Sequence, residues 1–488
     1  MKLTVSAAPI TELGNPVVVL PVFSRPGGAL PGPGLAELGL TGVIEQSRFH
    51  GAEEDELLIG ARPGDPFRAV LLIGLGPRDE VDLDTLRRAM EFAVRRLRQF
   101  ESIATTLPLA LASTTAGADE AAAVAEGALL GAYAYTGQKT QVSDPILVEE
   151  LTLAFRPEDD LTAVRESVEA ARIVCSAVNW ARTLVDRPGS DLTPLALAEE
   201  AESMAGRSGL EFRVRDADAL RKEGFGGILA VGGGSANPPC LIEVRHAGTN
   251  GRVVGLAGKG ITFDAGGLQL KTKAAMADMR SDMAGAATML ATARAAAELG
   301  CPTGVLAVVP AAENMPSDRA YRPGDVIRHY GGITSEVLDT DAEGRIVLAD
   351  ALAYLAQQTP HAIVDAATLT YDVIRALGDQ ITGILGSDRS LVADLIAAGS
   401  AVGEPMWELP LWAGYRRNID SPVADVRNEG GPFADAIHAG LFLAEFTNGL
   451  PWAHLDIAGT AYLEQADNRR PAGATGTGVR TLVKWLMN

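Results

Sequence analysis

Residues 253–267 read VVGLAGKGITFDAGG, and this stretch decides the fold class that we infer for the chain. Its first four residues form a short apolar run typical of a buried strand, and glycines end that run. An alanine-rich helical pattern follows over residues 281–299, then a strand over 304–309, a helix over 346–357 and a strand over 362–365. Repeated strand, helix, strand order predicts an α/β fold with a mostly parallel sheet covered by helices on both faces.

The residues before this region predict a second, smaller domain. The first 150 residues alternate strand-like runs with helical ones: Val17–Phe23, Ala69–Ile73 and Leu151–Phe155 are strand-like, and Leu86–Phe100 and Glu120–Ala134 are helical. Such alternation indicates a small α/β domain. The polar segment RPEDDLT, residues 156–162, suits an exposed join, and a long helical pattern over 161–185 follows it. We therefore predict an N-terminal domain over residues 1–160 and a larger C-terminal domain over residues 161–488.

Composition and charge disfavour several classes of function. A net charge of −20 argues against a nucleic-acid binder, because phosphate binding depends on clustered Lys and Arg. Cys175, Cys240 and Cys301 lie far apart without a CxxC pair, which predicts neither a disulfide framework nor a thiolate zinc site. The start of the chain lacks the pattern of a signal peptide, and no apolar run reaches the ~18 residues of a membrane span. We expect a soluble, cytoplasmic protein without a membrane partner.

Two glycine-rich loops raise the question of nucleotide binding: VGGGSANPP from Val231 and AGKGITFDAGG from Ala257. Neither is a phosphate-binding loop, because no glycine lies five residues before Gly258, and Gly260 stands where a Ser or Thr would hold magnesium. The chain also lacks GxGxxG, HExxH and GxSxG patterns. Dinucleotide binding, a thermolysin-like zinc protease and a nucleophilic serine are therefore disfavoured. Tight turns or close backbone approach explain these glycines better.

Acidic residues near these loops are candidate metal ligands. Asp264 ends a strand-like segment, at the edge where open α/β sheets bind ligands. Asp282 is expected on the first turn of the alanine-rich helix, where stabilisation of the helix dipole is the alternative explanation. The segment DTDAEGR, from residue 339, places Asp339, Asp341 and Glu343 at alternate positions of one loop. A solvated acidic turn that caps a helix is the alternative explanation there.

The surroundings of this loop favour metal binding. The apolar segments EVLD and IVLADALAYLA flank it, so the acids are expected at the edge of the core. Three crowded carboxylates are costly unless cations neutralise them, and Arg345 offsets only one charge. Oxygen ligands without clustered His or Cys suit zinc, manganese or magnesium in a dinuclear site.

Two segments resemble the signature blocks of the leucine aminopeptidase, or cytosol aminopeptidase, family. They are GKGITFDAGGLQLKTKAAMADMRSDMAGAA from Gly258 and DTDAEGRIVLADAL from Asp339. Further similarity covers NWARTLVDRPGSDLTP, AENMPS, DAATLT, WAHLDIAGTA and GATGTGVRTLV, so the resemblance extends over the chain from about residue 165. The first 155 residues match only weakly. The resemblance implies that the C-terminal domain is catalytic.

The resemblance implies an aminopeptidase with two divalent metal ions, zinc or manganese, with magnesium as an alternative. A hydroxide shared by the ions would attack the scissile carbonyl, and ligation of the free amine would select N-terminal residues. Asp264 and Glu343 would bridge the ions, and burial with two nearby cations would lower the pKa of Lys259 so that it binds metal. The five implied metal ligands are Lys259, Asp264, Asp282, Asp341 and Glu343.

The resemblance also implies two catalytic residues and a substrate pocket. Lys271 would stabilise the tetrahedral oxyanion, and Arg345 would hold a bicarbonate that acts as general base. The chain departs from the family twice: Asp339 replaces the usual asparagine, and ATLTYD replaces ATLTG. A ring and an anion in the pocket favour a long cationic side chain over leucine, unless Tyr371 turns toward a subunit contact. The expected pocket residues are Met279, Thr368, Tyr371, Asp372, Ala458 and Ala461.

The assembly is also implied by the resemblance. Members of the family form hexamers whose active sites face an interior space, which implies a homohexamer that admits short peptides. The N-terminal domain would then serve oligomerisation or access. Three alternatives stay open: a DNA-binding regulator, which the acidic charge disfavours; an inactive scaffold, which the intact ligands disfavour; and a dipeptidase or Cys-Gly-cleaving specialisation of the same site.

Overall fold

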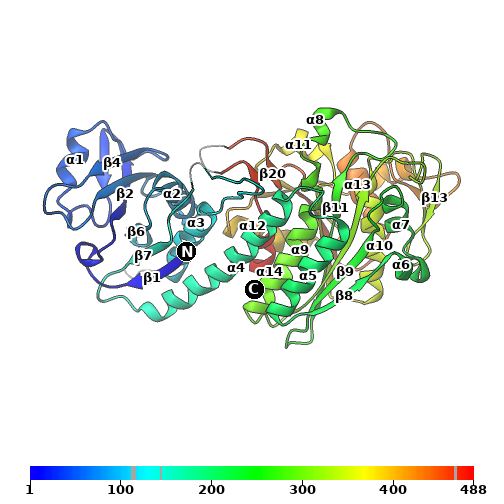
Figure 1. Ribbon diagram of the computed structural model, residues 1–488, viewed down its shortest axis with the longest axis horizontal. Helices are drawn as coiled ribbons and strands as arrows, with labels where there is room; N and C mark the ends of the chain where they lie inside the picture. Colours follow the sequence, from blue (N-terminus) through cyan, green and yellow to red (C-terminus); the bar gives the residue numbers. More distant parts are fainter. Residues whose placement is uncertain (112–116, 143–144, 467–469) are drawn as a thin grey trace. The chain divides into compact units, whose positions relative to one another are not determined.

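The structure is a computed structural model that describes residues 1–111, 117–142, 145–466 and 470–488 (Figure 1). It confirms the predicted two-domain α/β architecture. One compact unit comprises Met1–Ser176, and the other comprises Ala177–Ala466 with Pro471–Asn488. The division lies within helix α4 (Leu161–Asp186), and our boundary near residue 160 stays a prediction. Among the described residues, none of the helices has the length and hydropathy needed to span a membrane.

The N-terminal unit is built on a sheet of order β1-β7-β6-β2-β5-β4, with β3 beside β2. Side chains alternate along β2: Val17 and Val19 pack with α2 and α3, whereas Val18 and Leu20 face a second apolar cluster on the opposite side. Asp82 caps α2 by accepting a hydrogen bond from the Thr85 N–H at 2.8 Å. The elements are β1 (Lys2–Ser6), β2 (Val17–Arg25), β3 (Gly28–Pro31), α1 (Thr41–Gln46), β4 (Glu56–Gly60), β5 (Ala69–Pro77), α2 (Leu83–Arg96), β6 (Ser102–Thr105), α3 (Ala118–Gly131) and β7 (Glu150–Ala154).

The C-terminal unit is built on a larger sheet of order β17-β16-β19-β15-β10-β12-β9-β8, with β11 beside β12. Its centre is parallel, from β19 through β15 and β10 to β12, and antiparallel pairs flank this centre. The strands are β8 (Glu211–Arg215), β9 (Cys240–His246), β10 (Val253–Gly258), β11 (Gly260–Asp264), β12 (Gly304–Asn314), β15 (Ala362–Ala367), β16 (Thr382–Gly386), β17 (Met406–Glu408) and β19 (Trp452–Asp456). Short pairs outside it involve β13 (Val326–Arg328), β14 (Thr334–Glu336), β18 (Val426–Arg427), β20 (Tyr462–Leu463) and β21 (Gly473–Ala474).

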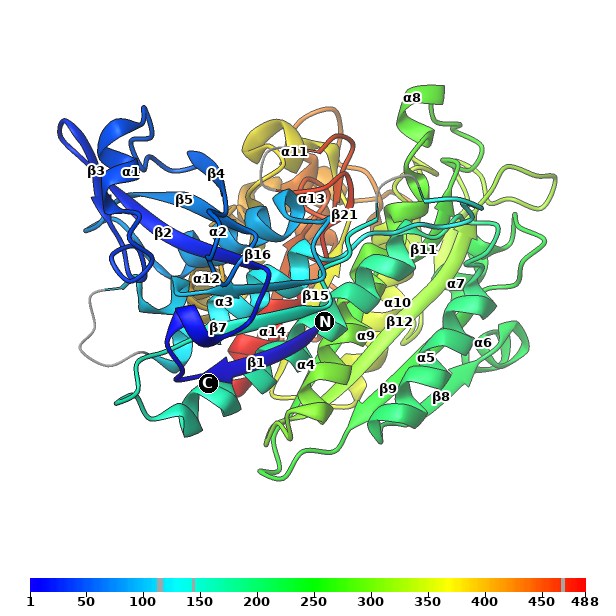
Figure 2. The ribbon, with the colours of Figure 1, turned by 60° about the vertical axis from the view of Figure 1, so that its left-hand side comes forward.

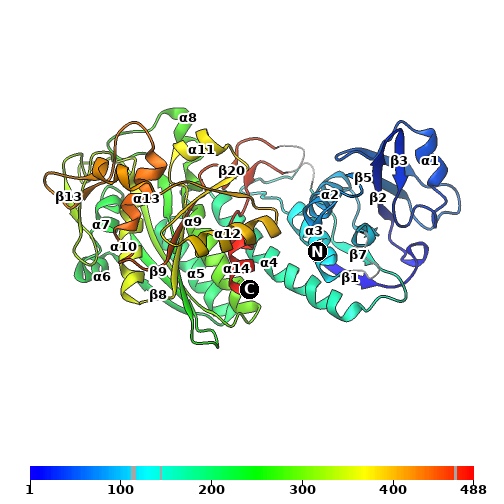
Figure 3. The same cartoon turned by 180° about the vertical axis from the view of Figure 1, so that it is seen from behind.

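Helices cover both faces of this sheet (Figures 1 and 3). Figure 2 shows α9 and α5 along strands β12, β9 and β8, and α7 and α10 pack on the opposite face. Every residue of β12 and β15 is buried, which explains their nearly continuous apolar sequences. The helices are α5 (Pro194–Ser208), α6 (Ala217–Glu223), α7 (Gly226–Gly232), α8 (Lys273–Met276), α9 (Ala284–Glu298), α10 (Glu343–Gln357), α11 (Tyr371–Leu377), α12 (Arg389–Ala401), α13 (Asp435–Ala444) and α14 (Val479–Met487).

One local prediction was wrong. The alanine-rich helix begins at Ala284, and Met279–Met283 form a separate 3₁₀ turn that contains Asp282. A 3₁₀ turn before an α-helix tightens the chain. Asp282 therefore precedes α9 and does not lie on its first turn.

Candidate active site

The parallel strands bring the candidate residues to one edge of the large sheet. Strand β10 ends at Gly258 and is followed by Lys259, β11 ends at Asp264, and β15 is followed directly by Thr368. All three positions are at carboxyl ends of strands, where open α/β sheets form their binding sites. Topology therefore places residues more than 100 positions apart around one site.

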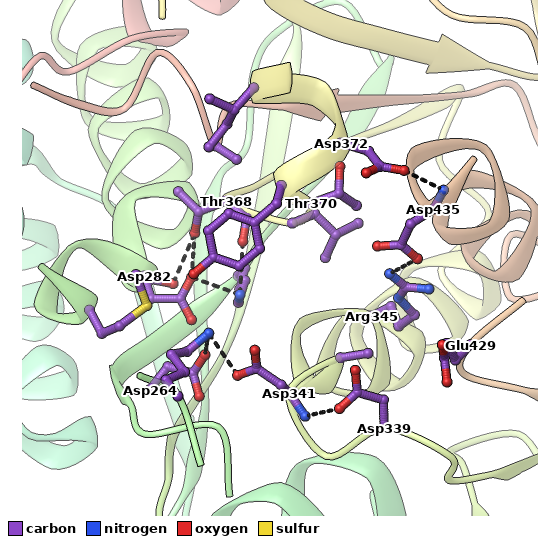
Figure 4. A pocket seen from close by; sticks show the side chains of 18 of the residues that line it. Asp264, Asp282, Asp339, Asp341, Arg345, Thr368, Thr370, Asp372, Glu429 and Asp435 are labelled. Carbon is purple, nitrogen blue, oxygen red and sulfur yellow. Dashed lines mark hydrogen bonds and ion pairs between the residues drawn. The ribbon is translucent and has the colours of Figure 1, made fainter. Parts of the chain in front are cut away.

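The acidic loop meets these strand ends in a buried cluster. Ligand oxygens of Asp264, Asp341 and Glu343 all lie within 4.8 Å of one another. The ammonium of Lys259 donates to Asp282 Oδ1 at 2.7 Å and lies 2.7 Å from Glu343 Oε1. The structure thus brings together all five residues that the sequence suggested as metal ligands, and Figure 4 shows three of the carboxylates around the cavity.

Two glycines allow this close packing. A Cβ atom on Gly344 would lie 2.7 Å from Lys259 Cε, so only glycine leaves room for the lysine side chain. Gly266 has a φ of 88° in the turn after β11, and its N–H donates to Asp264 Oδ1 at 2.8 Å. Glycine adopts this left-handed conformation without steric cost. The signature glycines therefore shape the backbone around the carboxylates.

The crowded charges shift the pKa values of the cluster. Burial, with Asp264 and Glu343 nearby, raises the pKa of Asp341 to about 7, although Lys271 opposes the shift. The sequence predicted a lowered pKa for Lys259 in the presence of two cations. Burial acts in that direction, but Asp282 and Glu343 outweigh it and leave the pKa above its ordinary value. In the protein alone, Lys259 is therefore an ammonium paired with carboxylates.

The donor set fits divalent metal ions. Asp282 Oδ2 and Glu343 Oε2 are buried and accept no hydrogen bond from any residue in the described ranges. Buried carboxylate oxygens without donors are costly, and metal coordination would satisfy them. The four carboxylates of the cluster also outnumber the two ammonium groups that contact them, those of Lys259 and Lys271. Hard oxygen ligands with excess negative charge suit divalent cations.

Lys271 lies between two of these carboxylates. Its Nζ is 2.8 Å from Asp264 Oδ2 and 2.7 Å from Asp341 Oδ1. The ammonium also lies 5.6 Å from the centroid of the Tyr371 ring, within the range of a cation–π contact. Burial by itself would lower the pKa of Lys271, but Asp264 and Glu343 reverse this and leave the pKa raised. Lys271 therefore keeps a positive charge at the cavity.

Arg345 lies in the first turn of α10 and is almost completely buried. Its Nη1 donates to the Asn428 carbonyl at 2.7 Å, and its Nη2 donates to Asp435 Oδ1 at 2.8 Å. The Asp435 N–H in turn donates to Asp372 Oδ2 at 2.9 Å. Groups of this chain therefore hold the guanidinium.

These groups surround a cavity of about 280 Å³. Of the expected pocket residues, Met279, Thr368, Tyr371, Asp372 and Ala458 line it. Lys271, Arg345 and four of the five cluster residues line it as well: Lys259, Asp264, Asp282 and Asp341. Ala461 is buried and is not among the lining residues. Thr368 Oγ1 donates to Asp282 Oδ1 at 2.6 Å, which ties the pocket wall to the carboxylate cluster.

Sequence reasoning missed the residues that hold the acidic loop. Asn314 Nδ2 donates to Asp264 Oδ1 at 2.8 Å and to the Thr340 carbonyl at 2.9 Å. Tyr321 donates to the same carbonyl at 2.6 Å, and Asn428 Nδ2 donates to the Asp339 carbonyl at 2.5 Å. The segment AENMPS, which contains Asn314, was the one available signal.

Comparison with known proteins identifies the family. The model of the catalytic domain of the cytosol aminopeptidase family matches residues 179–483, and that of the family's N-terminal domain matches residues 35–141. A probable cytosol aminopeptidase of Roseiflexus castenholzii is 41% identical over 491 residues, covering 100% of this chain and 99% of the relative.

Solved structures agree with this assignment. The bottromycin maturation enzyme BotP in complex with Mn is 37% identical with a TM-score of 0.86, covering 97% of this chain and 99% of that chain. A tomato leucine aminopeptidase mutant is 28% identical with a TM-score of 0.87, covering 100% of this chain and 96% of that chain. The resemblance inferred from the sequence is confirmed. The chain belongs to the cytosol aminopeptidase family and is a metal-dependent aminopeptidase, a hydrolase that acts on the N-terminus of peptides.

Proposed function

We propose that the chain removes the first residue from short peptides with two divalent metal ions, zinc or manganese. The observation that supports this most is the buried carboxylate cluster, whose oxygens lie within 4.8 Å of one another at the carboxyl edge of the sheet. When bound, the ions supply Lewis acidity and an activated water at neutral pH. The residues that would hold them are Lys259, Asp264, Asp282, Asp341 and Glu343, with Asp264 and Glu343 shared.

The remaining cavity residues orient the substrate and stabilise charge. Lys271 presents an ammonium group in a largely water-excluded position, where it stabilises the oxyanion that develops on the scissile carbonyl. Among the charged residues that line the cavity, acids outnumber bases, and the acids include Asp339, Asp372 and Glu429. An acidic cavity attracts the amino group of a free N-terminus and not a blocked one. These residues therefore favour exopeptidase action.

Location and assembly follow the family. We propose a cytoplasmic homohexamer, which the name of the curated relatives and the family resemblance support. The C-terminal unit exposes large apolar side chains, with Trp407 at 64%, Trp412 at 63% and Phe433 at 81%. Aromatic side chains are enriched at interfaces between proteins, which is consistent with an assembly. Light scattering coupled to size exclusion tests the hexamer, and a monomer at working concentration would contradict it.

A panel of aminoacyl amides and short peptides tests the activity, with protein stripped of metal and then reloaded with zinc, manganese or magnesium. We expect release of the first residue with at least one metal and no activity after chelation. Matched N-acetylated substrates should resist cleavage, because they lack the free amine. Cleavage of acetylated substrates, or inactivity with all three metals, would contradict the proposed function.

The unusual Asp339 is expected to tighten metal binding. Its Oδ1 accepts a hydrogen bond from the Asp341 N–H at 2.8 Å, and an asparagine oxygen can make the same contact. Asp339→Asn should therefore keep the loop conformation while it removes one negative charge from the cavity wall. We expect roughly three- to tenfold weaker metal affinity with activity retained at saturating metal. Competition with a chromogenic chelator measures the affinity; an unchanged metal titration and pH profile would show that this charge is solvated and incidental.

Tyr371 is expected to reduce the preference for leucine. The side chain is 46% exposed and lines the cavity near Lys271, where the family usually has glycine. The similarity to BotP, a maturation enzyme, supports a preference other than leucine. Asp372, however, already accepts a hydrogen bond from the Asp435 N–H and lies 3.2 Å from Arg375. These contacts weaken the electrostatic attraction between Asp372 and a cationic substrate.

The specificity prediction compares Leu, Met, Ala, Arg and Lys amides. Tyr371→Gly should raise kcat/KM for the Leu amide about tenfold relative to the Arg and Lys amides, because it opens the pocket. Tyr371→Phe is the matched control, since it keeps the ring and should rank the amides as the wild type does. If wild type and Tyr371→Gly rank them alike with Leu first, Tyr371 does not set the preference.

A further inference from the structure

The guanidinium of Arg345 is already bound to a carboxylate of its own chain. Arg345 side-chain exposure is 2%, and its two Nη atoms donate to Asn428 and Asp435. Its Nε is buried and has no hydrogen-bond partner among the described residues, so Nη1 and Nη2 are the atoms that an anion in the cavity would contact. Each Nη atom therefore already donates to a group of this chain, and Nη2 donates to a carboxylate.

Asp435 is positioned for this contact by the start of α13. It is the first residue of the helix and follows Ala434, a non-glycine residue with a φ of 61°. Such a backbone costs about 1 kcal/mol or more and persists where the surrounding structure enforces it. The Asp435 N–H is fixed by Asp372 Oδ2 at 2.9 Å. The side chain is 34% exposed, and Figure 4 shows its second oxygen pointing into the cavity.

These contacts do not fit a bicarbonate at Arg345. A second anion would have to displace Asp435 from Nη2 or lie against its carboxylate. The lining of the cavity also includes Asp339, Asp372 and Glu429. Like charges that share a partly buried site repel one another. A soluble anion is therefore disfavoured where the family resemblance implied one.

We propose that Asp435 is the built-in carboxylate that Arg345 presents to the reaction, in place of bicarbonate. The proposal rests on the proposed peptidase function. The attacking water gives one proton to the free Asp435 oxygen while its own oxygen bonds to the scissile carbonyl carbon. When the carbon–nitrogen bond breaks, the proton passes from Asp435 to the leaving amine, so the carboxylate is regenerated. The enzyme accordingly needs no added bicarbonate.

Chemical rescue tests this role. Wild-type turnover should be the same in carbonate-free buffer and with added bicarbonate. Asp435→Ala should lower kcat by about a hundredfold, and bicarbonate or formate should restore at least about tenfold of that loss, because the emptied space beside Arg345 admits a small carboxylate. Asp420→Ala is the matched control: Asp420 is also a carboxylate bound to an arginine, Arg416 at 2.6 Å, but it does not line the cavity. This control should lose no activity and gain no bicarbonate response.

A binding measurement separates this proposal from the peptidase proposal. Line broadening of ¹³C-labelled bicarbonate should appear with Asp435→Ala and not with wild type, in metal-loaded protein and again after chelation, which excludes binding to the metal alone. Bicarbonate binding can be measured even if the protein cleaves no substrate. Absence of cleavage would refute only the peptidase function. Bicarbonate binding to or activation of the wild type overturns the proposal. Full activity of Asp435→Ala also overturns it. A folded Asp435→Ala variant that bicarbonate neither rescues nor binds overturns it as well.

Discussion

Asp341→Asn and Glu343→Gln are expected to abolish peptide hydrolysis while the metal-free protein stays folded. Both carboxylates belong to the cluster whose oxygens lie within 4.8 Å of one another. An amide keeps the shape of the side chain but carries no negative charge, so it cannot neutralise a divalent cation. Loss of either ligand should therefore lower both metal content and turnover.

Metal-free Asp341→Asn should be no less stable than the metal-free wild type. Burial and the nearby Asp264 and Glu343 raise the pKa of Asp341, which means that its charge is unfavourable in the folded protein without cations. Replacing it with a neutral amide relieves this repulsion. The rise in melting temperature that metal gives the wild type should disappear in both variants, because ligand binding stabilises only a protein that binds it.

Metal analysis, turnover and thermal unfolding measured on the same samples check this prediction. Asp325→Asn is a matched acid-to-amide exchange outside the cavity, in a turn where Asp325 contacts Arg322. It should keep full metal content and full activity. If Asp341→Asn or Glu343→Gln retains a tenth of wild-type turnover with full metal content, the ligand assignment is wrong.

Local sequence pattern predicted the parts of the site that lie next to regular elements. Asp264 was expected at a strand end and lies at the end of β11. Glu343 was expected just before a helix and is the first residue of α10. Apolar runs flanked by glycine identify buried parallel strands, and their carboxyl ends form the binding edge of such a sheet. These positions therefore follow from short-range information.

The partners of Arg345 did not follow from any local pattern. Asn428 and Asp435 are 83 and 90 residues away in sequence. They reach Arg345 through tertiary pairing, including the short parallel pair of β14 with β18, and no periodicity encodes a contact at such separation. The interpretation of Asp372 as a substrate partner had the same weakness, because its contact with the Asp435 N–H is also long-range.

Lys271→Ala is expected to lower kcat by about 10²–10³, near 3 kcal/mol, and to leave KM almost unchanged. The ammonium is largely buried, with a side-chain exposure of 6%, and it lies within 2.8 Å of Asp264 and Asp341. A positive charge in a water-excluded site stabilises the oxyanion of the transition state more than the neutral carbonyl of the bound substrate. Its removal should therefore slow the chemical step and not substrate binding.

A loss of metal would also lower kcat, and metal content separates the two explanations. Lys271→Ala removes a cation from between two carboxylates, so the more negative site should hold divalent ions at least as tightly as the wild type. Lys273→Ala, an exposed lysine two positions along the chain, is the matched control and should change neither turnover nor metal content. A large rise in KM with unchanged kcat would instead place Lys271 in ground-state binding, because uniform binding of substrate and transition state affects KM alone.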